Sequence, residues 1–147
     1  MRRPILVPMM LVMLALLLAW PALAQNSTRA GEYVVHYNAL PSTRITPEVA
    51  RRSGITRSAN RALVNIAVRQ GGPGADRAVP AQVKLAVTNL SGQRVGLRAR
   101  EVREGDAIYY LAEARIAGQD TLTFELEVTV AGAAPIKASF RQEFFVE

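Results

Sequence analysis

Apolar and polar side chains alternate along most of the chain, with the period of a β-strand. The clearest run extends from Thr121 to Val130, where Leu, Phe and Val alternate with Thr and Glu. A period of two places successive side chains on opposite faces of a strand. In the segment 94–100 it would bury Val95, Leu97 and Ala99. The pattern predicts seven strands, at residues 32–40, 61–69, 82–88, 94–100, 107–116, 121–130 and 136–146.

Turn-forming residues separate these segments, with Gly, Pro, Ser or Asp at 71–74, 91–92, 104–106, 118–120 and 132–135. Strands with one buried face and one solvent-exposed face are typical of antiparallel sheets. Seven of them in about 115 residues are typical of an immunoglobulin-like sandwich. We therefore predict an all-β fold, a seven-stranded antiparallel sandwich that lacks the Cys–Trp–Cys core of antibody domains. A small β-barrel is the alternative.

One segment between the first two strands has the signals of a short helix. Thr46 suits the N-cap and Pro47 the first helical position. Gly54 suits the left-handed residue that ends a helix. We expect this helical insertion to bridge the two sheets.

The last two strands are expected to pair as a hairpin across residues 131–135. Counting back symmetrically from this loop sets Val130 opposite Ile136, and Glu125 opposite Arg141 on the wet face. An oppositely charged cross-strand pair of this kind contributes about 0.2–1 kcal/mol and helps to fix the register. The hairpin would bury Phe124, Leu126, Val128, Ala138 and Phe140 together.

The first residues have the organisation of a secretory signal peptide. Arg2 and Arg3 precede an uncharged apolar run from Ile5 to Trp20, and Ala-Leu-Ala ends at Ala24. We predict a signal peptide at 1–24, a flexible leader at 25–31 and a single domain at 32–147. An uncleaved anchor is the alternative, but the run is shorter than the roughly 20 residues that span a bilayer. The excess of Arg over Lys suggests a GC-rich bacterial genome, so export predicts a periplasmic location.

Several segments resemble a family of small exported proteobacterial proteins known as domain of unknown function 4426. The resemblance covers nearly all of the chain after the leader. It rests on residues 32–39, 45–50, 54–58, 103–113 and 140–144. The resemblance implies export and a β-rich fold. It implies no known activity, so no functional residue is assigned from it.

The composition excludes several kinds of chemistry. The chain has no Cys and one His, His36, which excludes disulfides, Cys-type zinc sites and any catalytic pair of histidines. No Gly-x-Ser-x-Gly motif is present. The glycines at 71–74 and the Glu104–Asp106 segment are interpreted as turns, and Tyr109 and Tyr110 must point to opposite faces of one strand. We predict no metal, no cofactor and no catalytic residue.

Positive charge is concentrated in one part of the chain. The whole chain has 18 basic and 12 acidic residues, a net charge of +6. Beyond Ala24 the net charge is +4, and residues 42–61 carry all of it, with five Arg against Glu48 alone. Such a patch favours an anionic envelope surface or an acidic envelope protein. The predicted binding residues are Arg51, Arg52, Arg57 and Arg61.

The same arginines also suit the negative end of the helix dipole, so helix stabilisation alone is an alternative explanation of their position. The sequence thus predicts a non-catalytic periplasmic interaction module of unknown partner. Nucleic acid is not expected as a partner after export, and no membrane span is expected after cleavage. Two other functions stay open. One is an envelope lipid or glycan binder with an apolar slot between the sheets, and the other is a hydrolase that uses His36.

Overall fold

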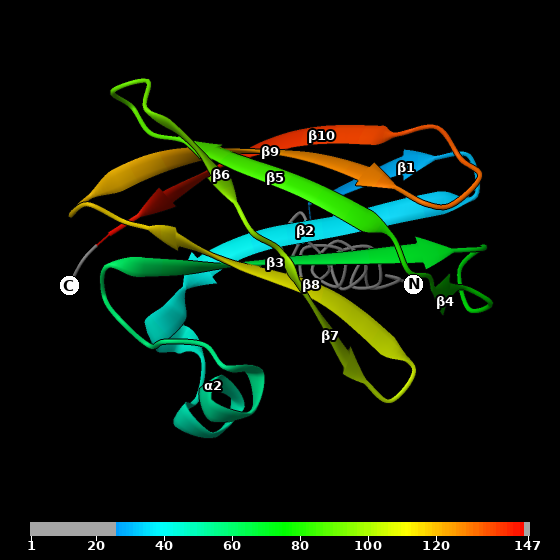
Figure 1. Ribbon diagram of the computed structural model, residues 1–147, viewed down its shortest axis with the longest axis horizontal. Coiled ribbons are helices and arrows are strands. Elements are labelled where there is room, and N and C mark those ends of the chain that lie inside the picture. The colour runs from blue at the N-terminus through cyan, green and yellow to red at the C-terminus, as the bar shows by residue number, and fades with distance from the viewer. Residues whose placement is uncertain (1–25, 146–147) are drawn as a thin grey trace, which may run out of the picture.

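Two antiparallel sheets pack face to face in the computed structural model, which describes residues 26–145 (Figure 1). The first sheet has the order β1-β2-β3-β8-β7, with β4 paired to β3, and the second the order β10-β9-β5-β6. The strands of the first sheet are β1 (Ser27–Ala30), β2 (Tyr33–Pro41), β3 (Arg61–Gln70), β4 (Arg77–Ala78), β7 (Arg100–Glu104) and β8 (Ala107–Arg115). Those of the second are β5 (Gln82–Thr88), β6 (Arg94–Leu97), β9 (Asp120–Thr129) and β10 (Ile136–Phe144).

This topology is that of an immunoglobulin-like sandwich. Strands β2-β3-β8-β7 follow the A-B-E-D order of such domains, and β10-β9-β5-β6 follow G-F-C with an added C′ strand. All strand pairs are antiparallel. The all-β sandwich prediction is confirmed. The sheets of the described residues stay open, so the barrel alternative is wrong.

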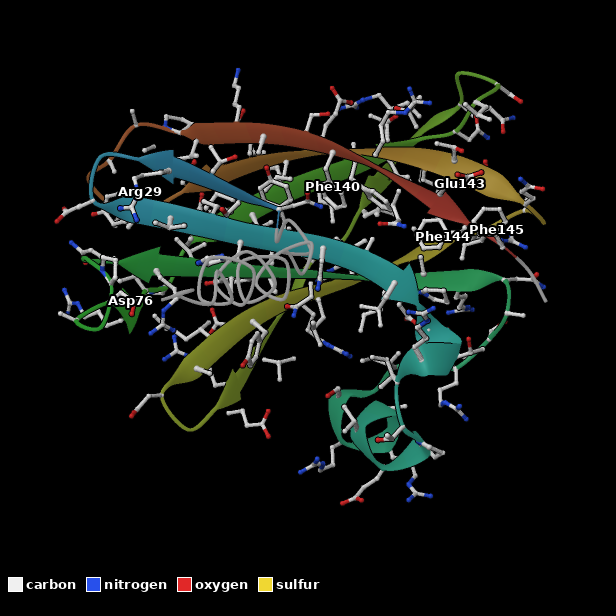
Figure 2. All side chains as sticks on the ribbon, turned by 180° about the vertical axis from the view of Figure 1, so that it is seen from behind. Arg29, Asp76, Phe140, Glu143, Phe144 and Phe145 are labelled. Atoms are coloured by element: carbon white, nitrogen blue, oxygen red, sulfur yellow. The ribbon has the colours of Figure 1, made fainter. Side chains whose placement is uncertain are left out.

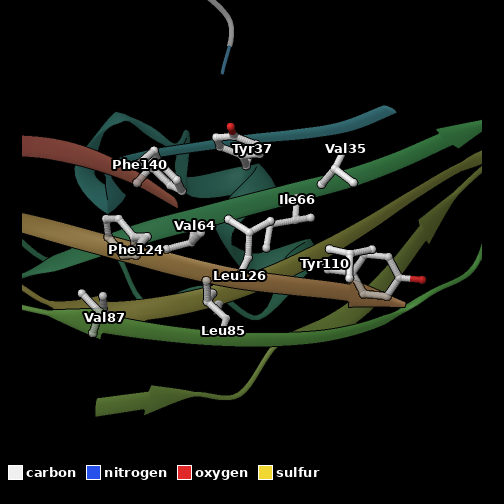
Figure 3. Packing of buried hydrophobic residues seen from close by; sticks show 14 of the residues in the cluster. Val35, Tyr37, Val64, Ile66, Leu85, Val87, Tyr110, Phe124, Leu126 and Phe140 are labelled. Atoms are coloured by element: carbon white, nitrogen blue, oxygen red, sulfur yellow. The ribbon is translucent and has the colours of Figure 1, made fainter. Parts of the chain in front are cut away.

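The core between the sheets is filled by the apolar side chains of alternate strand positions (Figure 3). Phe124 is fully buried, and its ring stacks on Phe140 with centroids 4.9 Å apart. Phe140 in turn stacks on Tyr37 of the opposite sheet at 5.0 Å. Of the adjacent tyrosines, Tyr110 is buried and Tyr109 faces outward, as predicted.

Six of the seven predicted strands are present as single strands, the predicted strand 94–100 is divided, and the chain also forms β1, β4 and β7. Strand β1 lies inside 25–31, so the prediction of a flexible leader there is wrong for Ser27–Ala30. Gly31, at φ 59°, reverses the chain so that Ala30 pairs with Tyr33 and Ser27 with His36. Four residues with three polar side chains are too short an alternation to reveal a strand.

The predicted strand 94–100 is two strands in different sheets. Strand β6 ends at Leu97, and the chain then crosses to the first sheet to form β7. Val95 is 56% exposed rather than buried, and Leu97 and Ala99 are only partly buried. The reason is that β6 is the last strand of its sheet, so the opposing sheet covers little of its inner face.

The register predicted for the last hairpin is wrong by two residues. Ile136 pairs with Val128, and Glu125 lies opposite Ser139 rather than Arg141. The connection is longer than predicted, because a turn joins the Ala133 N–H to the Val130 carbonyl at 3.0 Å. A shift of two keeps each side chain on its predicted face. Phe124, Leu126, Val128 and Phe140 are buried as predicted, and Ala138 partly so.

The predicted helix is present as α2 (Pro47–Ser53), preceded by the 3-10 turn η2 (Ser42–Arg44). The Thr46 side chain accepts a hydrogen bond from the Val49 N–H at 3.3 Å, and Gly54 has φ 63°. The expected bridge between the sheets is wrong, because β2 and β3 are neighbours in one sheet. Instead α2 projects outside the two layers (Figure 1), and Ala50 and Ile55 pack on Leu63 of the outer face.

Candidate functional site

The helical insertion, residues 42–60, is pinned at its base by Ser42. This serine is fully buried. Its hydroxyl donates to the Ser58 carbonyl at 2.9 Å and accepts from the Ser58 N–H at 2.9 Å. The two hydrogen bonds join residues that are 16 positions apart in the chain. The insertion is therefore held by its own polar contacts as well as by Leu63.

Two of the four predicted binding residues serve to hold the insertion. Arg57 donates from Nε to the Ile45 carbonyl at 2.6 Å and from Nη2 to the Thr43 carbonyl at 2.9 Å. Arg61 pairs with Glu113 at 3.6 Å. Glu113 also accepts a hydrogen bond from the Thr56 N–H at 3.1 Å, which ties the insertion to β8.

The other two predicted residues are available for binding. Arg51 and Arg52 lie in the last turn of α2 and are exposed. Neither makes a side-chain hydrogen bond or ion pair with another residue of the described chain. Val49, on the same short helix, is 37% exposed. The structure thus separates the four arginines into an outward pair and an engaged pair, a division that counting charges could not reveal.

Two further arginines lie beside the outward pair and were not predicted as binding residues. Both are exposed, but Arg100, like Arg57, is engaged by a backbone carbonyl of the insertion. An Arg100 guanidinium nitrogen donates to the carbonyl of Ser53 at the end of α2. Arg98 and Arg100 line a hollow of about 440 Å³ beside the insertion, with Ile55, Leu63 and Leu111 among its apolar walls. We call Arg51, Arg52, Arg98 and Arg100 the cationic surface. The alternation of residues 94–100 predicts that Arg98 and Arg100 are exposed to solvent. Their position next to α2 depends on the crossover between the two sheets, which the alternation does not show.

In the part of the chain that the structure describes, aromatic rings fill the centre of the sandwich, where the apolar slot of a lipid or glycan binder was expected. An open groove of about 700 Å³ lies instead between β6 and the end of β8. Its apolar lining includes Val87, Val95, Ile116 and Leu122, and polar side chains such as Asn89 and Arg115 contribute to its wall.

His36 lies on β2, where its side chain points away from the core. Ser27 is its cross-strand neighbour. No hydrogen bond joins His36 to a serine or a carboxylate within residues 26–145, and Nδ1 is buried without a partner, as is Oδ1 of Asn65. No group of three potential metal ligands among His, Cys, Asp and Glu occurs in the described part of the chain. These contacts do not assemble a nucleophile and base.

The remaining polar features lie in turns. The glycine-rich segment 71–74 connects β3 to β4, and Arg69 and Asp76 form an ion pair across it. The Arg69 guanidinium holds the pKa of the Asp76 carboxyl below its usual value. Figure 2 shows Asp76 at the end of the molecule opposite to Phe144 and Phe145. Gly105, at φ 58°, forms the turn between β7 and β8 as predicted.

Comparisons with known proteins place the chain in a family and identify its fold. The family model "Domain of unknown function (DUF4426)" matches residues 27–147. A crystal structure of a DUF4426 family protein from Pseudomonas aeruginosa PAO1 is 32% identical, with a TM-score of 0.72. The match covers 83% of this chain and 95% of that one. No curated protein matches.

Two structures of FetP from uropathogenic Escherichia coli strain F11 are also similar in fold. One was recombinantly expressed in the periplasm, and its TM-score is 0.59 over 82% of this chain and 93% of that chain. The other is a copper-bound variant, with a TM-score of 0.58 over 82% of this chain and 95% of that chain. Both are 11% identical to this chain, so the likeness concerns the fold alone.

Proposed function

We propose that this chain, which belongs to the DUF4426 family, is a non-catalytic interaction module of the bacterial periplasm that docks onto anionic phosphate-bearing membrane surfaces. The observation that carries the proposal is the outward pair, Arg51 and Arg52, exposed on an insertion that projects from the sandwich. Arg98 and Arg100 extend the same positive surface.

The geometry favours a membrane surface for two reasons. A projecting helix can reach a flat surface without interference from the sandwich behind it (Figure 1). Its partly exposed Val49 adds an apolar contact beside the two arginines, the combination typical of interfacial helices. The hydrogen bonds of Ser42 and Arg57 hold the insertion in place, so little conformational entropy is lost on docking.

The test compares two pairs of substitutions that remove the same charge. Arg51→Gln with Arg52→Gln is expected to weaken binding to vesicles of anionic phospholipid by roughly 25-fold, since each arginine near such a surface contributes about 1 kcal/mol. The melting temperature should change little, because exposed charges stabilise folds weakly. Vesicle co-sedimentation at low and high salt measures the binding, and zwitterionic vesicles provide the baseline.

Arg57→Gln with Arg61→Gln is the matched control. This pair should retain most of the vesicle binding but lower the melting temperature, because it removes the carbonyl contacts and the Glu113 ion pair. Equal loss of binding in both double variants would assign the effect to net charge rather than to the cationic surface. If the wild-type protein does not bind anionic vesicles, a membrane surface is excluded as the partner, and an acidic protein becomes the expected partner.

The periplasmic location follows from the predicted signal peptide, which lies outside the described residues. Within residues 26–145, no helix is long and apolar enough to cross a membrane. We expect cleavage after Ala24, because the Ala-Leu-Ala pattern follows directly on the apolar run. Mass spectrometry of protein from the native host should show a chain that begins at Gln25. An intact Met1 end in the membrane fraction would contradict export with cleavage.

A further inference from the structure

Strand β7 is an open edge of the first sheet. It pairs with β8 on one side, and no other strand of the described chain pairs with its second side. Figure 1 shows β7 at the border of the first sheet, with α2 as the element on the side away from β8. Four of its five residues are exposed. Open edges usually carry charges that prevent pairing with other chains.

The charges of β7 are antisymmetric about Val102. When two copies of this strand lie antiparallel with Val102 opposite itself, every positive residue meets a negative one. Arg100 then comes opposite Glu104, and Glu101 opposite Arg103. The strand has no net charge, and the match covers all four of its charged residues.

Only this register gives the match. A slip of one residue sets Arg100 opposite Arg103, or Glu101 opposite Glu104. A slip of two sets Glu101 or Arg103 opposite its own copy. Like charges directly opposite each other destabilise a strand pair. The charges of β7 therefore oppose pairing in the shifted registers and favour pairing with a second copy of β7 in the one register that centres on Val102.

We propose that a second copy of this chain pairs with β7 in this register, about a two-fold axis that passes between the two copies of Val102. Such an isologous contact uses the same patch on both subunits, which is what an antisymmetric charge pattern fits. An unrelated peptide would not require the pattern. Main-chain hydrogen bonds would join the two first sheets into one.

The side chains around β7 allow this pairing. Arg100 and Glu104 lie on the outer face of the sheet, since their neighbours on β8 are Leu111 and Ala107. Glu101 and Arg103 lie on the other face and already contact each other at 2.6 Å within one chain. In the dimer they would form a network of four alternating charges. Both copies of α2 would lie on the same face of the joined sheet, because the two-fold axis is perpendicular to it.

Charge reversal with rescue tests the proposal, and analytical ultracentrifugation measures it. Wild-type protein should form dimers in a concentration-dependent manner. Glu101→Arg and Arg103→Glu should each weaken self-association about tenfold or more, since each turns two attractive cross-strand pairs into repulsive ones. An equimolar mixture of the two variants should regain the wild-type affinity, because Arg then faces Glu at both pairs.

Arg141→Glu and Glu143→Arg, which make the same charge changes on β10, an edge strand of the second sheet, provide matched controls. Both should dimerise like the wild type. A wild type that is monomeric at every concentration would overturn the proposal. So would a mixture that fails to recover, or a dimer lost through the β10 variants instead.

A second measurement uses the absence of cysteine from the chain. Residues directly opposite in an antiparallel pair have Cα atoms about 4.5–5.5 Å apart, within the range that a disulfide requires. Val102→Cys should therefore form a disulfide-linked dimer with oxidised glutathione. Ser139→Cys on β10 should stay mostly monomeric. Equal cross-linking of the two variants would contradict pairing through β7. These experiments measure mass only, so they are independent of membrane docking.

Discussion

Replacing Phe124 with alanine is expected to lower the free energy of unfolding by about 3–5 kcal/mol. The side chain is fully buried at the centre of the sandwich. Its ring stacks on Phe140, which stacks on Tyr37 of the other sheet, so the substitution leaves a cavity where the two layers meet (Figure 3). Since domains are stable by only about 5–15 kcal/mol, this loss is a large part of the total.

Urea unfolding followed by circular dichroism measures this change. Phe145→Ala is the matched control, because Phe145 is 62% exposed and follows the last strand. Its free energy of unfolding should change by no more than about 0.5 kcal/mol. A loss below about 1 kcal/mol for Phe124→Ala would contradict the packing of the core, since it would mean that the two sheets do not close around this ring.

The core was predictable from the sequence because it depends on local periodicity. The alternation from Thr121 to Val130 assigns Phe124 to the buried face whatever the register of the strand. For this reason the hairpin prediction identified the buried residues correctly but assigned the wrong cross-strand partners between β9 and β10. The ends of α2 were predictable for a similar reason, since Thr46, Pro47 and Gly54 act on the backbone next to them.

The features that periodicity missed depend on contacts between distant residues. Glu125 forms an ion pair at 3.1 Å with Arg94 on β6, the strand beyond its neighbour β5, and nothing in the hairpin sequence points to this partner. The alternation of 94–100 continues through the crossover at Arg98, so it cannot show that β7 leaves the sheet of β6. The position of α2 follows from β2 and β3 being neighbours, which only the complete topology establishes.

In the candidate site, too, the local sequence predicted some features, while others depend on contacts between distant residues. Counting charges correctly found an excess in 42–61, but it treated the arginines as equivalent. Arg57 is engaged by two backbone carbonyls whose positions depend on the fold of the insertion. Arg100 comes from a strand 47 residues beyond Ser53, whose carbonyl it contacts. A charge count states how much positive charge a segment has, and the fold decides which side chains are left to bind.

Ser42→Ala is expected to destabilise the insertion by about 2–4 kcal/mol, because it leaves both the N–H and the carbonyl of Ser58 without their partner. The hydroxyl is buried, so water does not readily replace it. Hydrogen exchange should show faster exchange of the Ser58 amide, and urea unfolding should show the loss of stability. Ser91→Ala, in an exposed turn, is the control and should change neither measurement.

The same variant also tests how the insertion supports binding. Ser42→Ala retains Arg51 and Arg52, so its charge is that of the wild type. If a fixed α2 is what presents the cationic surface, vesicle binding should weaken in this variant, because ordering the loosened insertion would oppose docking. Unchanged binding with a rapidly exchanging Ser58 amide would show that the arginines act as mobile charges. An unchanged amide would contradict the role of Ser42 itself.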